Sequence, residues 1–357
     1  MISLPKKWVN EMGLVQGSPL TITRHNSTSL IISVDRTVAG KGIFAGGEDI
    51  VVLSIPPIEA PETTAVKISC LYLQGFNLIK VKFAENSLTS ARKSAIRELI
   101  RRQLIGVEII SDSSDGLMVQ ILLGKSELSI ENAMKRMSIV FSSMREEAIS
   151  SLASFDKKRA LDVIQKDEID RFASYAARHI LGSLNHRVFK LGDDSEPEKL
   201  AVHLVISTAI QNAADCAREI ASQTLRVNAP LNERNITDLR KINETATGIF
   251  DSAVLSFFKR DSRAAEKTIE SAKKFPDLER EFLETLTRTK NGTSGEELVA
   301  LVSALESLKK IVHYASDIST QVLGLSTEQY VEIEDGRKVS NRLMMNEVPL
   351  VRSSYEI

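Results

Sequence analysis

The stretch ALDVIQKDEIDRFASYAARHILGSLN, residues 160–185, decides how the second half of this chain is interpreted. Its apolar residues recur at steps of mostly four, which gathers them on one stripe of a helix. They are Leu161, Ile164, Phe172, Ala176, Ile180 and Leu184. Asp167 and Asp170 are three positions apart, so they share one side of that helix. The spacing predicts a single long helix over 160–185 with an acidic side.

Amphipathic helices are also predicted on both sides of this stretch. Residues 129–155 carry a bundle seam at steps of three and four, made by Met134, Met137, Phe141, Met144, Ala148, Leu152 and Phe155. Further helices are expected over 198–227, up to 258, over 262–289 and over 296–323. The segment SFFKRDSRAAEKTIESA at 256–272 echoes SLASFDKKRALDVIQKD at 151–167. This echo predicts an internal duplication of a three-helix unit.

The residues Asp167-Glu168-Ile169-Asp170-Arg171 resemble the D-x-[IV]-D-R signature of the PhoU family of phosphate-uptake regulators. In that family the signature lies on the second helix of a three-helix unit. The resemblance implies two PhoU-like repeats, over 129–227 and 231–325, followed by a tail at 326–357. It also implies negative regulation of phosphate uptake or metabolism.

The PhoU resemblance further implies metal sites. Helices of this family commonly carry an E-x-x-x-D pair on the third helix of each repeat, where bundled carboxylates offer hard oxygen ligands to a cation. Here the corresponding positions hold Gln211 and Asp215 in the first repeat, and Lys309 and His313 in the second. The candidate ligands for a divalent, iron or zinc-type ion are Asp167, Asp170 and Asp215. The alternative is that these are solvated charges on a bundle surface.

No working metal site is expected in the second repeat. Its acidic residues Asp261, Glu266 and Glu270 do not reproduce the spacing of Asp167 and Asp170. Lys309 would also place a positive charge where a cation should bind.

Residues 1–50 resemble a different family. The run SLPKKWVNEMGLVQGSP at 3–19 is similar to the AbrB/SpoVT swapped-hairpin DNA-binding module, with a helical turn expected at 8–12 and strands at 20–22 and 30–34. The family motif follows a basic first strand, and this sequence begins inside that strand. The resemblance implies a homodimer and makes Lys6, Lys7 and Arg24 candidate phosphate contacts on DNA. Dimerisation without DNA binding is the open alternative.

A small α/β domain is predicted over 65–128. The proline-rich, acidic run at 56–64 is interpreted as a linker, and CLYLQGFNLIKVKF at 70–83 as a strand pair. A basic helix is expected over 90–104, most simply as a solvated face, and strands over 107–111 and 116–123.

The composition and the missing motifs limit the function classes. A formal net charge of -1 argues against a globally basic nucleic-acid binder. The sequence shows no apolar run of membrane-spanning length and no signal peptide, so we expect a cytoplasmic protein. It contains no phosphate-binding loop, no nucleophile motif and no histidine spacing suited to a ligand set, so no enzymatic activity is expected.

The predicted fold is mainly α, with two three-helix repeats preceded by a small α/β domain and an N-terminal β-hairpin module. Two functions compete. One is a phosphate-responsive transcription regulator that binds DNA through the N-terminal module. The other is an adaptor that restrains a phosphate ABC transporter by protein contact. A metal-binding bundle is a third hypothesis.

Overall fold

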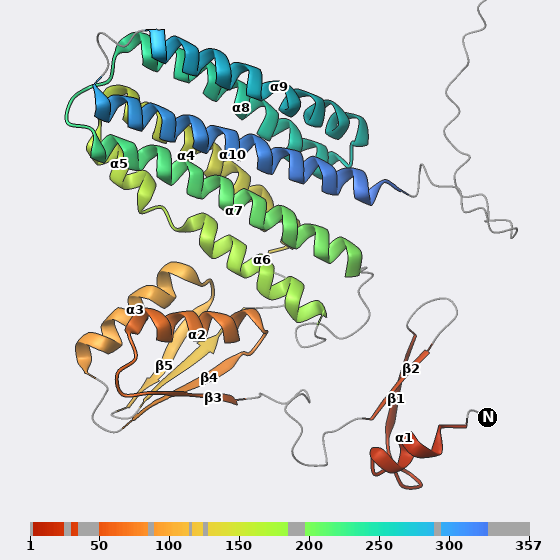
Figure 1. Cartoon of the computed structure of the whole chain (residues 1–357). Coiled ribbons are helices and arrows are strands. Elements are labelled where there is room, and N and C mark those ends of the chain that lie inside the picture. The colour runs from red at the N-terminus through yellow and green to blue at the C-terminus, as the bar shows by residue number, and fades with distance from the viewer. Residues whose placement is uncertain are drawn as a thin grey trace, which may run out of the picture.

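The computed structural model describes residues 3–24, 30–34, 50–84, 89–113, 116–123, 128–184, 197–288 and 294–327. Figure 1 shows an N-terminal helix with a β-hairpin, then a small α/β domain, then a long helical bundle. The predicted mainly α class with a small α/β region before the bundle is confirmed.

The N-terminal module is a short helix followed by a two-stranded antiparallel sheet. Helix α1 covers Lys6–Glu11, and Pro5 occupies its N-cap position. Gly13 follows with a φ of +62°, a conformation that glycine adopts without strain. Strands β1 (Leu20–Arg24) and β2 (Leu30–Val34) pair through their whole length. The predicted helical turn and both predicted strands are therefore present.

The α/β domain is a four-stranded sheet with strand order β3-β4-β6-β5. Strands β3 and β4 run parallel, and the other two pairings are antiparallel. Its elements are β3 (Ile50–Ile55), α2 (Pro61–Leu73), β4 (Leu78–Phe83), α3 (Ser90–Gln103), β5 (Val107–Asp112) and β6 (Gly116–Ile121). The buried side chains of α2 and α3 pack on Ile79, Val81 and Val119 of the sheet.

Two predictions in this domain are wrong. The first half of the expected strand pair at 70–83 is helical, because it belongs to α2, and the expected linker at 56–64 ends inside the same helix. Pro61 starts this helix, and Ala65, Ile68 and Tyr72 are buried at helical spacing. Strand β3, which pairs with β4, had no counterpart in the prediction.

Seven described helices form the bundle (Figure 1). They are α4 (Ile130–Ser154), α5 (Lys157–Ile164), α6 (Glu168–Leu184), α7 (Pro197–Arg226), α8 (Glu233–Lys259), α9 (Ser262–Arg288) and α10 (Gly295–Leu325). Helix α7 packs on α4, α5 and α6, and α10 packs on α8 and α9. Helices α7 and α10 also pack on each other and so join the unit of α4, α5, α6 and α7 to the unit of α8, α9 and α10.

The two units share the same junction between their first and second helices. Helix α4 ends at Phe155 and α8 at Arg260, both in the left-handed conformation with a φ of 54°. The next residue is an aspartate in each case. Asp156 Oδ1 accepts the N–H of Arg159 over 3.0 Å, and Asp261 Oδ1 accepts the N–H of Ala264 over 3.0 Å. These paired caps support the predicted duplication.

The predicted single helix over 160–185 is wrong, because α5 and α6 are separated by a break at residues 165–167. The N–H of Lys166 bonds to the carbonyl of Val163 over 3.3 Å, which tightens the last turn of α5. The freed carbonyl of Lys166 accepts a bond from Arg218 of α7. The apolar stripe continues across the break, so the periodicity alone did not reveal it. The partner that stabilises the break lies on another helix.

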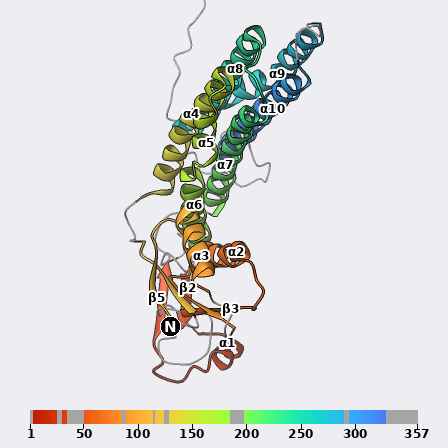
Figure 2. The same cartoon turned by 90° about the vertical axis from the view of Figure 1, so that its left-hand side faces the viewer.

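One buried arginine joins the α/β domain to the bundle. Arg178 of α6 is 3% exposed, and its guanidinium donates to the carbonyls of Tyr72, Gly75 and Phe76 and to Oδ1 of Asn77. These acceptors lie at the C-terminal end of α2, where helix carbonyls lack partners within the helix. Figures 1 and 2 show α2 and α3 between the sheet and α6. The helical layer of the domain is thereby fixed to the bundle.

Candidate functional site

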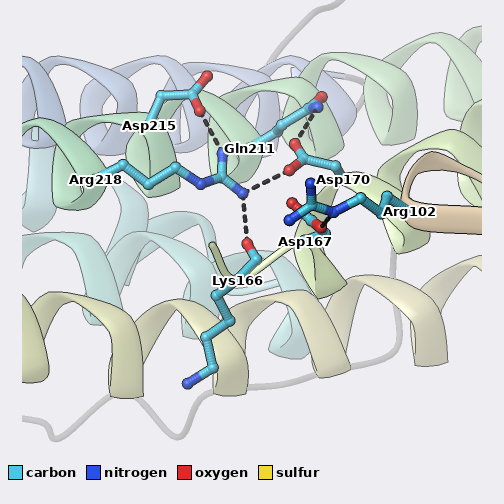
Figure 3. A network of polar contacts seen from close by, with 7 residues as sticks. All are labelled: Arg102, Lys166, Asp167, Asp170, Gln211, Asp215 and Arg218. Carbon is cyan, nitrogen blue, oxygen red and sulfur yellow. Dashed lines mark hydrogen bonds and ion pairs between the residues drawn. The ribbon is translucent and has the colours of Figure 1, made fainter. Parts of the chain in front are cut away.

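Two of the three acidic residues that the sequence singles out, Asp170 and Asp215, contact one arginine of the bundle, Arg218 on α7 (Figure 3). One guanidinium nitrogen donates to Oδ2 of Asp170 over 2.5 Å and to the carbonyl of Lys166 over 2.8 Å. The other terminal nitrogen donates to Oδ1 of Asp215 over 2.5 Å. The side chain of Arg218 is 17% exposed, so these contacts are partly shielded from solvent. Arg218 therefore holds two of the three predicted ligands and the helix break.

The second oxygen of Asp170 is also occupied. Gln211 Nε2 donates to Asp170 Oδ1 over 2.8 Å. Gln211 stands at the first position of the expected carboxylate pair, and its amide supplies a donor where a carboxylate would supply only an acceptor. Both oxygens of Asp170 therefore accept hydrogen bonds from α7.

Asp167 lies apart from this group. Its Oδ2 accepts a bond from Nε of Arg102, at the end of α3, over 2.9 Å. The structure brings Asp170 and Asp215 together through Arg218, while Asp167 pairs with the α/β domain (Figure 3). Lys166 contributes only its carbonyl, because its ammonium lies near Ser143 and Glu147 of α4.

The second repeat has a comparable centre, at residues that the sequence patterns did not indicate. Lys309 of α10 donates from Nζ to Oε1 of Glu279 on α9 over 2.8 Å, and the Glu279 side chain is 12% exposed. The segment Pro276-Asp277-Leu278-Glu279-Arg280 aligns with Asp167-Glu168-Ile169-Asp170-Arg171. This alignment is the sequence feature from which Glu279 could have been predicted. It was obscured because proline replaces an aspartate, and because other acidic residues lie nearer the start of α9.

Positions on the third helices support the same alignment. The run IASQTL at 220–225 of α7 matches ISTQVL at 318–323 of α10, and the same offset places Gln211 opposite Lys309. Gln211 contacts Asp170, and Lys309 contacts Glu279. The hydrogen bond to Glu279 is the main reason why the pKa of Lys309 is raised above its usual value. Asp170 of α6 and Glu279 of α9 therefore contact matching positions of α7 and α10.

The carboxylates do not fit the metal site that the PhoU resemblance implies. A hard cation requires several converging oxygens with no competing positive charge. Here Arg218 lies between Asp170 and Asp215, and Lys309 lies on Glu279. Within the described ranges, no group of three His, Cys, Asp or Glu side chains has the geometry to hold a metal ion.

The candidate DNA contacts are only partly described. Lys6 and Lys7 are exposed on α1. The backbone of Arg24 pairs with Leu30, but the Arg24 side chain lies outside the described part. Contact between these residues and DNA stays a prediction.

The basic helix α3 makes contacts within the chain in addition to facing solvent. Arg92 donates to the carbonyls of Pro57 and Glu59, and Lys93 and Arg97 both pair with Asp112 of β5. The hydrogen bond from Lys93 is the main cause that lowers the pKa of Asp112. These cations stabilise the α/β domain.

One histidine is buried at the junction of the domain and the bundle. His179 of α6 is 7% exposed, and its ring centroid lies 4.3 Å from that of Tyr175. Burial, and secondarily the charge of Arg178, lowers the pKa of His179 from 6.5 to about 4. His179 is therefore neutral at pH 7.

Comparison with known proteins supports the fold of the helical part. No family model and no curated protein matches the sequence. PhoU from Pseudomonas aeruginosa aligns with a TM-score of 0.51 and 16% identity, over 56% of this chain and 96% of that chain. The phosphate transport system regulatory protein PhoU from Streptococcus pneumoniae aligns with a TM-score of 0.48 and 16% identity, over 57% and 96%. The helical part has a PhoU-like fold. Among the described helices, none has the length and apolar character needed to cross a membrane.

Proposed function

We propose that this chain is a phosphate-responsive, negative regulator of phosphate uptake that works in the cytoplasm through its PhoU-like bundle. The observation that carries the proposal is that the fold match extends over 96% of PhoU from Pseudomonas aeruginosa. Two polar centres of the bundle are ion pairs between its own side chains, Arg218 with Asp170 and Lys309 with Glu279.

The partner proposed for the bundle is a component of a phosphate ABC transporter. In this adaptor mechanism the bundle binds the transporter when phosphate is abundant and restrains it. Arg178 fixes the α/β domain to α6, so the domain and the bundle would present one surface to the partner. Phosphate and the transporter component would then act on a domain and a bundle that are joined to each other.

The test is phosphate uptake in the source organism with the gene deleted. Uptake of labelled phosphate in phosphate-rich medium should rise, and the full-length chain supplied in trans should restore restraint. An unchanged uptake rate in the deletion strain, at both high and low phosphate, would refute the proposal.

DNA binding is a second candidate, supported by the N-terminal module. Lys6 and Lys7 are exposed on one short helix beside a β-hairpin, as the AbrB/SpoVT resemblance implies. Removing one side chain that binds a DNA phosphate should reduce the dependence of log affinity on log salt by about one unit. Lys6→Ala with Lys7→Ala should therefore weaken binding to all promoter sequences. No binding of the native chain at low salt would exclude this candidate.

The same double variant separates the two candidates in the cell. An adaptor should restrain phosphate uptake without Lys6 and Lys7, whereas a DNA-binding regulator should not. Restored restraint by the Lys6→Ala, Lys7→Ala chain therefore favours the adaptor.

We also propose that the N-terminal module pairs two chains. Ile22 and Leu30 are each 56% exposed on a two-stranded sheet, and small isolated hairpins are marginally stable in water. Interleaving with a second copy would cover these residues. Light scattering that gives the mass of a monomer at micromolar concentration would contradict this proposal.

A further inference from the structure

Each unit of the bundle places one carboxylate against its last helix, from α6 onto α7 in the first unit and from α9 onto α10 in the second. In the first unit this is Asp170 beside Gln211, and in the second it is Glu279 beside Lys309. The two acceptors occupy matching positions of the repeat, and both contacts measure 2.8 Å. The duplicated fold therefore builds a carboxylate centre twice.

The chain itself supplies a positively charged side chain to each centre. The two side chains do not stand at matching positions of the repeats. In the first unit the cation is Arg218, whose counterpart in the second unit is Ser316. In the second unit it is Lys309, whose counterpart in the first unit is Gln211. Because neither cation has a basic counterpart in the other repeat, the pattern is not explained by copying of one ion pair.

The geometry leaves a metal ion little access to the first centre. Asp170 uses one oxygen for Arg218 and the other for Gln211. A guanidinium stays charged across the whole physiological pH range and binds carboxylates with a planar set of donors. A metal would have to displace a cation that is tethered to the same helix bundle, and it would be repelled by that cation.

In the second centre the charge of Glu279 is likewise neutralised by a side chain of the protein, Lys309. The Glu279 side chain is 12% exposed, and the Lys309 ammonium, which is charged at neutral pH, lies 2.8 Å from its carboxylate. The next position of the expected metal pair holds His313, whose ring nitrogen lies 3.7 Å from Asp317. Lys309 and His313 therefore replace the carboxylate pair that the PhoU resemblance implies.

We propose that Arg218 and Lys309 are permanent counter-ions that take the place of metal cations at the two carboxylate centres of this PhoU-like bundle. The chain then reaches its full stability without metal, in contrast to what the family resemblance implies. Removal of Arg218 would expose two aspartates and the Lys166 carbonyl as a set of hard oxygens. Such a set suits a divalent cation.

The experiment is thermal melting of the full-length chain with zinc, manganese, magnesium or calcium, and with a chelator. The native melting temperature should be the same in every one of these conditions. Arg218→Gln should melt at a lower temperature in chelator, and a divalent cation should restore part of the loss, because ligands that bind only the folded state stabilise it. Equilibrium dialysis should show the ion bound to this variant.

The matched control is Arg226→Gln on the same helix, since Arg226 forms an exposed ion pair with Glu219. This variant should stay insensitive to metal. Lys309→Gln tests the second centre independently, and it should bind a divalent cation more tightly than the native chain does in dialysis. This comparison remains decisive if Arg218→Gln does not fold.

Two results would overturn the proposal. One is a native chain that binds a divalent ion in dialysis and melts at a higher temperature with it. The other is a set of folded Arg218→Gln and Lys309→Gln variants that respond to metal no more than Arg226→Gln does.

Discussion

Arg102 Nε lies 2.9 Å from Asp167 Oδ2, so the last turn of α3 contacts the chain where α5 gives way to α6. The two side chains are 48% and 34% exposed. The contact joins the α/β domain to the helix break that Arg218 holds from the other side. Residues 165–167 are therefore held both by the α/β domain, through Arg102, and by the bundle, through Arg218.

This pair should show a small but measurable coupling. Exposed ion pairs contribute about 0.2–1 kcal/mol in double-mutant cycles. We expect that value for Arg102→Ala combined with Asp167→Asn, from urea unfolding of both single variants and the double variant. Glu98→Gln in place of Asp167→Asn gives the comparison within α3, because Glu98 forms a longer ion pair of 3.9 Å with Arg102 on the same helix. A coupling of zero for Arg102 and Asp167 would remove this link between the domains.

Arg178→Ala should destabilise the chain far more. The guanidinium is buried and donates to three carbonyls and one amide oxygen, which lose their partner when it is removed. Hydrogen bonds to charged groups contribute roughly 1.5–3 kcal/mol each, so we expect a loss of at least about 3 kcal/mol. The measurement is the free energy of unfolding in urea. Arg171→Ala, exposed on the same helix, should change it by less than about 0.5 kcal/mol.

His179 should make the fold sensitive to mild acid. Its pKa is about 4 in the folded chain and 6.5 as the unperturbed value. Between these values the unfolded chain binds a proton that the native chain excludes, so stability falls as the pH decreases from 6.5 to 4. The difference corresponds to a loss of roughly 3 kcal/mol at 1.36 kcal/mol per pKa unit.

The corresponding measurement compares unfolding free energies of the native chain and His179→Leu across this pH range. The variant should lose less stability on acidification, since the buried titrating group is gone. His313→Gln, at a histidine side chain that is 72% exposed, serves as the control. Equal pH profiles for the native chain and His179→Leu would contradict the prediction.

Arg260→Gly should stabilise the chain. Arg260 has a φ of 54° at the end of α8, where glycine carries no steric penalty from a side chain. Relief of this strain should raise the unfolding free energy by about 0.5–1 kcal/mol, and thermal melting would detect it. Phe155→Gly at the matching position of the first unit should instead lower stability, because Phe155 packs against the core. A lower melting temperature for Arg260→Gly would contradict this prediction, because it would show that the Arg260 side chain stabilises the fold by more than its backbone strain costs.

Local patterns predicted much of the fold but not the breaks in it. Helical periodicity predicted the bundle because α4, α7, α8 and α10 each bury a regular apolar stripe. It failed at residues 165–167, where the break depends on Arg218, which lies 52 residues from Lys166 in the sequence. It also failed for α2, since the short apolar run at 70–73 fits a strand or a helix equally well until its burial partners are known.

The sequence predicted residues of the candidate site, but it did not predict which groups they bind. The acidic signature identified Asp167 and Asp170, and the expected pair on the third helix identified Asp215. The structure places Asp170 and Asp215, but not Asp167, on Arg218. Spacing along one helix cannot show which cation reaches a carboxylate from a neighbouring helix. Glu279 was overlooked for a related reason, because its role follows from contact with Lys309.

The metal content of the native full-length chain tests most directly whether its own side chains neutralise the two centres. The chain would be produced in medium supplemented with zinc, manganese and iron, purified without chelator and analysed by elemental mass spectrometry. We predict that no metal is present in a stoichiometric amount. One or two ions per chain, lost in Asp170→Asn or Glu279→Gln, would show that metal occupies the sites assigned here to Arg218 and Lys309.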